Sequence, residues 1–160
     1  MQNNQSIIDK FPTTGVKGDD GERFLFEQLL KRYEVVNDYR QNLTMQNVGV
    51  DFGFGALNWK RETTLDVKNN LYITRDKIGF KVEIQKNGKP GWFFTSKADR
   101  IYHVCAYQKK FMYYDLGDLR SYVFRNNTEL ELVDYKDGKD VLIQFYHSTS
   151  LPVSQIYLAS

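Results

Sequence analysis

Two short segments contain charged residues whose types and spacing suit a metal-dependent phosphate site. Asp51 lies in the segment VGVDF, and Asp66 and Lys68 lie in the segment TLDVKN. Side chains alternate along a strand, so Asp66 and Lys68 would share one face while Leu65 and Val67 anchor the other. Carboxylate oxygens bind Mg²⁺, and an ammonium group neutralises a phosphate. We therefore expect Asp66 and Lys68 on an exposed face, with Asp51 on a neighbouring strand.

A helix predicted over residues 20–33 would bring another carboxylate to this site. Asp19 and Asp20 can cap its N-terminus, and its apolar residues recur three and four positions apart. The same spacing places Glu22 on the apolar side, toward the sheet edge, whereas Glu27 falls on the polar side. Glu22 is therefore the helix residue expected to help hold a metal or its water shell.

Short strands are predicted along the rest of the chain, where apolar residues alternate with polar ones or form continuous runs. The segments that contain Asp51 and Asp66 would form a hairpin, and the dipeptide Asn87-Gly88 indicates a further turn. A short helix is expected at 117–123. The expected strands are 34–39, 48–54, 63–68, 80–86, 101–107 and 111–116, with further strand-like stretches between 130 and 156.

Composition predicts one domain with a sizeable core, because the chain has 160 residues and is 41% apolar and 15% aromatic. Residues 1–17 are expected to form a flexible arm before a domain at 18–160. No apolar run approaches the ~20 residues of a membrane span, and no signal peptide is indicated. The single cysteine, Cys105, excludes an internal disulfide and favours a reducing compartment. We therefore expect a cytoplasmic protein without a membrane partner.

The basic residues are concentrated in the middle of the sequence. The net charge is only +2, yet residues 81–110 contain seven basic and two acidic side chains. Such a concentration favours contact with a polyanion, and an ordinary solvated surface is the alternative. The basic residues of this segment are Lys81, Lys86, Lys89, Lys97, Arg100, Lys109 and Lys110.

The order of a helix acid, a strand aspartate and an Asp-Val-Lys strand resembles the restriction-endonuclease-like PD-(D/E)XK nuclease superfamily. The resemblance covers about residues 18–107. It implies an α/β (α+β) fold whose αβββαβ core has a mixed central sheet, extended here by C-terminal strands. Val50 stands where proline is usual in the superfamily, and Asp66 stands where glutamate is commoner.

The resemblance also implies roles for individual residues. Glu22, Asp51, Asp66 and Lys68 match the catalytic positions of the superfamily. Asp51, Asp66 and the carbonyl of Val67 match its metal ligands. The implied cofactor is Mg²⁺, for which Mn²⁺ may substitute.

The implied activity is that of a metal-dependent DNA endonuclease that hydrolyses phosphodiester bonds. Compact Holliday junction resolvases of the superfamily are homodimers, so analogy extends the expectation to branched DNA and a homodimer. Two other readings stay open. The chain could be a catalytically inactive nucleic-acid-binding module of the same fold, or an interaction protein with no nucleic-acid role.

A rival placement of the second motif uses the predicted strand that contains Glu83. Glu83 and Gln85 would share a face there, but Lys86 would point to the opposite face and no lysine would complete the set. Gln85 could instead line the site and donate a hydrogen bond to water or phosphate.

The segment Trp92–Arg100 resembles the Lys-Ala-Asp segment before a core strand in some members of the superfamily. Ser96 and Lys97 are candidates to hold a phosphate, and Trp92 or Phe93 could either stack on an unpaired base or belong to the core. The other residues expected to contact DNA are Lys86, Lys89 and Arg100.

The remaining residues with reactive side chains are expected to have structural roles. His103 lies in an apolar strand and is predicted to be a core histidine. His147 has no cysteine or second histidine at metal-ligand spacing. Cys105 is expected to be buried and inert.

Overall fold

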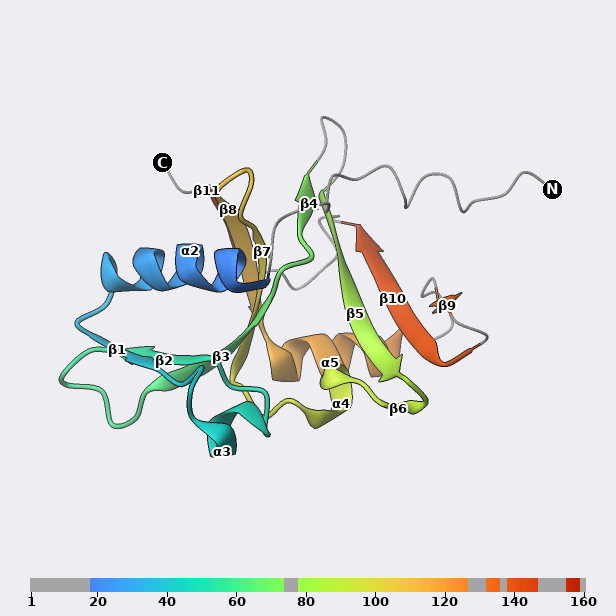
Figure 1. Cartoon of the computed structure of the whole chain (residues 1–160), viewed down its shortest axis with the longest axis horizontal. Coiled ribbons are helices and arrows are strands. Elements are labelled where there is room, and N and C mark those ends of the chain that lie inside the picture. The colour runs from blue at the N-terminus through green and yellow to red at the C-terminus, as the bar shows by residue number, and fades with distance from the viewer. Residues whose placement is uncertain (1–17, 74–77, 127–131, 136–137, 147–154, 159–160) are drawn as a thin grey trace.

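The strands form two sheets, with helices on either side of the larger one (Figure 1). The computed structural model describes residues 18–73, 78–126, 132–135, 138–146 and 155–158. None of the helices in these ranges is long and apolar enough to cross a membrane. The elements are α2 (Gly18–Leu30), β1 (Val35–Asp38), α3 (Leu43–Gln46), β2 (Phe52–Gly55), β3 (Thr63–Lys68), β4 (Tyr72–Ile73), β5 (Ile78–Lys86), β6 (Lys89–Pro90), α4 (Trp92–Thr95), β7 (Arg100–Cys105), β8 (Lys110–Asp115), α5 (Leu116–Arg125), β9 (Leu132–Tyr135), β10 (Asp140–Tyr146) and β11 (Gln155–Leu158).

The larger sheet is mixed and has the strand order β1-β2-β3-β7-β8-β11. β3 and β7 are parallel, so that Asp66 lies beside Ile101 and Lys68 lies beside His103. The other neighbours in this sheet are antiparallel. The second sheet is antiparallel in the order β4-β5-β10-β9, and β6 also pairs with β5. The expected mixed α/β class is therefore confirmed.

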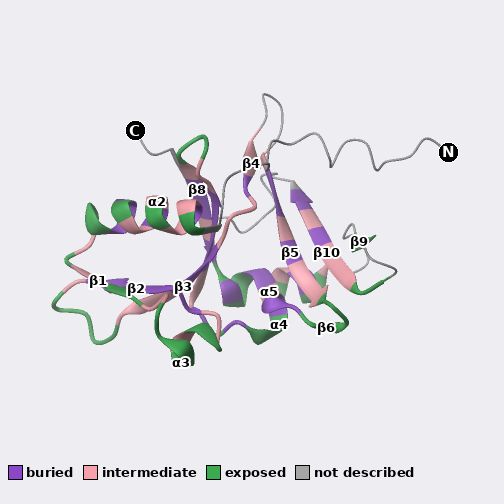
Figure 2. Cartoon of the chain, viewed as in Figure 1, coloured by how far each residue is buried: buried purple, intermediate pink, exposed green. Residues whose placement is uncertain are grey.

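Each face of the larger sheet packs on a separate apolar cluster. On one face Leu65 and Val67 of β3 pack with Leu25 and Leu29 of α2. The other face packs against the second sheet, α4 and α5, and the buried residues in Figure 2 lie mostly between these layers. Asp66 alternates with Leu65 and Val67, so it points into this second interface. The expectation of an exposed face for Asp66 is wrong, because the layer formed by β5, α4 and α5 covers it.

Most predicted elements are present, with shifted ends. The predicted helix 20–33 begins earlier and ends at Leu30. The strand predicted at 63–68 is confirmed. The strand predicted at 48–54 begins only at Phe52, because the chain first forms α3 and then a turn in which Gly49 has a φ of +68°. The expected arm at 1–17 lies outside the described residues.

Asp99 joins the beginnings of the two parallel strands. Its Oδ2 accepts hydrogen bonds from Thr64 N at 2.8 Å and from Thr64 Oγ1 at 3.1 Å. The guanidinium of Arg61 donates to both carboxylate oxygens, at 2.9 and 3.0 Å. Hydrogen bonding to Arg61 is the main reason why the pKa of Asp99 lies below its usual range. This carboxylate fixes where β7 begins relative to β3.

We expect Asp99→Ala to lower the free energy of unfolding by about 2 kcal/mol, because the partly buried Thr64 N–H would lose its acceptor. The measurement is urea unfolding followed by circular dichroism. Arg61→Ala is the matched control, and it should cost clearly less than Asp99→Ala because the Arg61 side chain is mostly exposed. Equal losses in the two variants would contradict a structural role for the bond between Asp99 and Thr64.

Candidate active site

The carboxylate of Asp51 accepts a backbone hydrogen bond from β3 directly beyond the end of the β2–β3 pairing. The backbone N–H of Asp51 donates to Leu65 O at 2.9 Å, and its side-chain Oδ2 accepts from Val67 N at 2.7 Å. Gln46 of α3 donates to Asp51 Oδ1 at 3.1 Å. The N–H and C=O of a strand residue point to the same side, so the Val67 carbonyl also points toward the side where Asp51 lies. The two predicted ligands are thus placed next to each other.

Asp66 is buried beside Asp51 and Lys68, with only 2% of its surface exposed. Its Oδ1 lies 2.7 Å from Lys68 Nζ, whereas its Oδ2 has no hydrogen-bond partner among the described residues. The pKa of Asp66 is raised to about 7, mainly by burial; the charge of Lys68 opposes the shift and the charge of Asp51 adds to it. An unsatisfied buried oxygen costs free energy, and none of the described residues offsets that cost for Asp66 Oδ2.

Glu22 approaches the same sheet edge from α2, on the opposite face of the sheet from Asp66. Its Oε2 lies 3.9 Å from Nη1 of Arg40, whose guanidinium also pairs with Asp38 at 2.6 Å. Burial raises the pKa of Glu22, and the charge of Asp51 is the second cause. Glu22 and Asp51 therefore lie within electrostatic reach of each other. Arg40, which pairs with Glu22, was not identified by the sequence analysis.

Lys68 rests on a buried set of aromatic and polar side chains. Its Nζ lies 5.5 Å from the centre of the Trp92 ring, a distance typical of a cation–π contact. The neighbouring His103 is fully buried, and its Nδ1 and Nε2 contact Asn70 Oδ1 and the Tyr114 hydroxyl. The prediction of a core histidine is confirmed.

The protonation of His103 follows from its partners. The Asn70 amide donates to the Lys81 carbonyl at 2.8 Å, so its Oδ1 accepts from His103 Nδ1–H. Nε2 of a neutral ring then accepts from the Tyr114 hydroxyl. Burial, and then the charge of Lys68, hold the pKa of His103 well below its usual value. The buried group of Asn70, His103 and Tyr114 beside Lys68 is therefore uncharged.

Gly49 and Ser96 close the site beside Asp66. A β-carbon at position 49 would lie 3.1 Å from Ser96 Oγ and 3.3 Å from Asp66 Oδ2. The Ser96 hydroxyl donates to Gly49 O at 3.1 Å, and Lys97 N donates to Val48 O at 2.8 Å. Ser96 is thus brought to the site as predicted. Sequence analysis missed Gly49, although a glycine two residues before the motif aspartate was a usable signal.

The other residues expected to contact DNA are spread over the molecule. Lys86 and Lys89 lie on the exposed hairpin of β5 and β6. The Gln85 amide donates to the carbonyls of Gly138 and Lys139, at 2.8 and 3.3 Å, so its contacts are structural. Arg100 pairs with Asp115 at 2.9 Å and lies over Tyr113, on the α2 face of the sheet. The structure therefore does not bring Arg100 to the face that carries Asp66.

The rival motif around Glu83 has a different geometry from the one expected. Lys86 Nζ lies 3.7 Å from Glu83 Oε2, so the expectation that this lysine faces away is wrong. Its long side chain reaches back from the end of the strand. The Glu83 carboxylate also accepts a hydrogen bond from Trp92 N at 3.4 Å, whereas Asp66 and Lys68 lie next to Asp51.

The remaining residues can also be placed. Trp92 and Phe93 are buried core residues, so the alternative in which either stacks on a base is wrong, and Phe94 is the exposed aromatic of α4. Cys105 is half-buried and reduced, which corrects the expectation of full burial. His147 lies outside the described residues.

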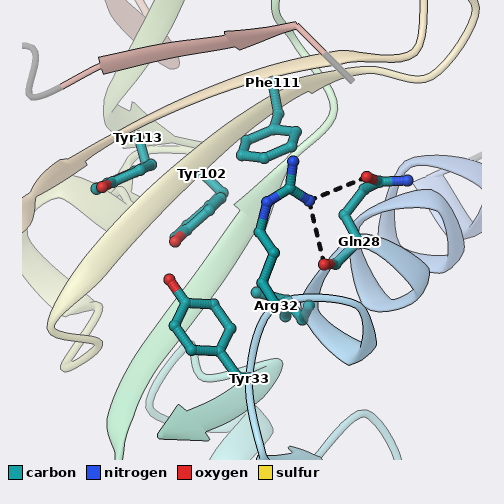
Figure 3. Close-up of a pocket in the computed structure, with 7 residues that line it drawn as sticks. Gln28, Arg32, Tyr33, Tyr102, Phe111 and Tyr113 are labelled. Carbon is teal, nitrogen blue, oxygen red and sulfur yellow. Dashed lines mark hydrogen bonds between the residues drawn. The ribbon is translucent and has the colours of Figure 1, made fainter. Parts of the chain in front are cut away.

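A pocket lies on the α2 face of the sheet, away from Asp66 (Figure 3). It has a volume of about 40 Å³, enough for a few water molecules but not for a nucleotide. Arg32 donates to the backbone and side-chain oxygens of Gln28, at 3.1 and 3.0 Å, on one side of it. Its lining residues are Gln28, Leu29, Arg32, Tyr33, Tyr102, Phe111 and Tyr113.

The residues of the candidate site suit a hard divalent cation. Within the described ranges, no three His, Cys, Asp or Glu side chains come together as a metal cluster. Mg²⁺ does not need such a cluster, because it usually keeps several waters and takes one or two carboxylates together with substrate phosphates. Asp51, Asp66 and the Val67 carbonyl offer only oxygen, and the unpartnered Asp66 Oδ2 fits a cation as its missing partner.

Comparisons of the chain with protein-family models, with curated proteins and with solved structures found no match.

The raised pKa of Asp66 predicts a dependence of stability on pH. Between about pH 4 and 7 the folded protein keeps the Asp66 proton while the unfolded chain releases it, so this residue makes unfolding easier as pH rises. Above pH 7 its contribution is constant. We expect Asp66→Asn to gain stability relative to the native protein across this window, as measured by urea unfolding at a series of pH values. Parallel pH profiles for the two proteins would contradict the assignment.

Proposed function

We propose that this protein is a Mg²⁺-dependent DNA endonuclease of the PD-(D/E)XK type. The observation that carries the proposal is that Oδ2 of buried Asp66 has no hydrogen-bond partner among the described residues, while its Oδ1 lies 2.7 Å from Lys68 Nζ. A carboxylate in this position destabilises the fold unless it is protonated or binds a cation. Its burial is therefore better explained by ligand binding than by stability.

The arrangement of the elements supports the same proposal. The chain runs through a helix and three antiparallel strands, α2 and β1 to β3, and returns through α4 to β7, which is parallel to β3. This order agrees with an αβββαβ core into which β4, β5 and β6 are inserted. The strands β8 and β11 would extend the sheet beyond that core.

Each residue of the site would have its own role in phosphodiester hydrolysis. Bound Mg²⁺ would polarise the scissile phosphate and lower the pKa of an attacking water. Asp51, Asp66 and the Val67 carbonyl would hold it, and Glu22 would orient its water shell from the α2 side. Lys68 would neutralise the phosphate or orient the water, because its ammonium lies beside Asp66 and an uncharged buried group of side chains.

DNA cleavage should require Mg²⁺ or Mn²⁺, and should fail in EDTA or with Ca²⁺ alone. Asp51→Ala, Asp66→Ala and Lys68→Ala should each slow cleavage by at least about 10²-fold, the usual effect of losing one transition-state-stabilising group. The measurement is cleavage of a panel of labelled duplex, flap and branched DNAs with each metal.

Glu27→Ala is the matched control for these variants, because Glu27 is an exposed acid on the same helix as Glu22. It should cleave as the native protein does. Undiminished cleavage in EDTA would overturn the metal mechanism. DNA binding without cleavage under every metal would instead favour the inactive binding module, and loss of cleavage in Glu83→Ala but not in Asp66→Ala would favour the rival motif.

Lys97 is the exposed cation nearest to the site in the sequence, directly after Ser96, and it should contact a DNA phosphate. Each such contact contributes about −0.9 to the slope of log affinity against log salt on duplex DNA. Lys97→Ala should therefore flatten the slope by about one unit and weaken all sequences alike, as measured by fluorescence anisotropy in Ca²⁺.

Arg100→Ala provides the comparison for Lys97, because Arg100 pairs with Asp115 on the opposite face of the sheet. Its salt dependence should match that of the native protein. A slope near zero, or one that Lys97→Ala leaves unchanged, would place the DNA surface elsewhere.

A further inference from the structure

We propose that Phe94, on the helix that borders the site, stacks on an unpaired nucleotide of the bound DNA, so that the substrates are DNAs in which a duplex meets a single strand. This inference rests on the proposed nuclease function and specifies the substrate class of the same site. It starts from the position of α4, whose residues touch the site at both ends of the helix.

The ends of α4 lie against the candidate catalytic residues. Trp92, at its beginning, lies 5.5 Å below Lys68 Nζ. Ser96, directly after its end, donates to the carbonyl of Gly49, where an added β-carbon would lie 3.3 Å from Asp66 Oδ2. Phe94 lies between these two contacts and turns to solvent, with 52% of its surface exposed. An exposed aromatic ring thus lies on the solvent side of the short helix whose buried side borders the site.

The ring of Phe94 is held on a firm support. It meets the buried ring of Phe93 edge to face, with the ring centres 4.9 Å apart. Arg120 of α5 donates to the carbonyls of Phe93 and Ser96, both at 2.8 Å, and so fixes α4 on both sides of Phe94. A ring fixed in this way loses little conformational entropy when a base stacks on it.

The charges around Phe94 favour a nucleic acid over a second copy of the chain. Three exposed lysines, Lys86, Lys89 and Lys97, lie in residues 84–98, which contain no acidic residue; Lys86 also pairs with Glu83 at 3.7 Å. In a symmetric dimer through this surface, the lysines of one copy would face those of the other. A polyanion would neutralise them. Aromatic rings set among cations are typical of surfaces that bind single-stranded nucleic acids.

An unpaired base is the part of DNA that can stack on the ring of Phe94. Within a duplex, the faces of each base are covered by its neighbours, whereas an unpaired base can stack on an aromatic side chain. The lysines would hold the backbone of either form of DNA. Phe94 would therefore discriminate in favour of substrates with a single-stranded segment.

The test compares two DNAs, one a blunt duplex and the other the same duplex with a single-stranded extension that contains a fluorescent adenine analogue. Binding is measured in Ca²⁺ with the full chain. We expect Phe94→Ala and Phe94→Leu to weaken binding of the extended DNA about tenfold and to restore the fluorescence that stacking quenches. Phe94→Tyr should bind as the native protein does, because it keeps the ring, and the blunt duplex should bind all variants equally.

Other results would overturn the inference. Equal binding of the extended DNA by Phe94→Ala and the native protein, or an equal loss on both DNAs, would exclude stacking. Native-like binding by Phe94→Leu would show that only an apolar contact is made. If Phe94→Ala and Phe124→Ala instead abolished a dimer in sedimentation and left DNA binding intact, this surface would be a protein interface.

The outcome is distinguishable from failure of the proposed function. If no metal supports cleavage but the Phe94 variants lose binding as expected, the nuclease proposal fails and the stacking surface stands. If cleavage depends on Asp66 while the Phe94 variants bind both DNAs normally, the nuclease proposal stands and the stacking surface falls.

Discussion

The burial of the Asp66 carboxylate is the constraint around which the candidate site is organised. Its position on β3 points it into the interface between the two sheets, where 2% of its surface is exposed and one oxygen has no partner among the described residues. Lys68 compensates for part of this cost at 2.7 Å, whereas Asp51 adds to it. The rest of the site can be understood as an arrangement that tolerates this charge and leaves one oxygen of Asp66 open to a ligand.

Two features allow the carboxylates of Asp51 and Asp66 to remain close to each other. The Asp51 carboxylate accepts a strand N–H from Val67 and an amide N–H from Gln46, so both of its oxygens have hydrogen-bond donors. On the face that carries Asp66 and Lys68, burial keeps His103 neutral, and its two ring nitrogens pair with Asn70 and Tyr114. A cationic histidine there would repel Lys68 away from Asp66. The polar residues of the core therefore set the charge of the site as well as fill space.

Much of the fold could be predicted from the sequence where the pattern was local. The alternation of Leu65 and Val67 with Asp66 and Lys68 gave the bounds of β3 and the separation of its two faces. The Asn87-Gly88 turn was also evident, since both residues have the positive φ that such a hairpin turn requires. Alternation could not reveal that the Asp66 face is covered, because β5, α4 and α5 lie far from β3 in the sequence.

The site was predicted less completely, for a related reason. Asp51, Asp66, Lys68 and Ser96 could be selected by residue type and spacing, and the structure brings them together. Arg100 was selected by charge alone, and the register of β7 places it beside Leu65, on the face that packs against α2. Strand register decides the face of a residue, and one position separates Arg100 from the face that carries Asp66.

The departures from regular structure are concentrated at the site itself. β2 begins later than its apolar pattern indicates, because Gly49 takes a positive φ and leaves Asp51 outside the strand. That delay frees the Asp51 side chain to occupy the place of a backbone carbonyl opposite Val67. A regular strand through residue 51 would satisfy the same N–H with a carbonyl and would turn the carboxylate elsewhere. Local rules fail here because the chain gives up one backbone pairing to place a carboxylate at the sheet edge, as expected of a functional position.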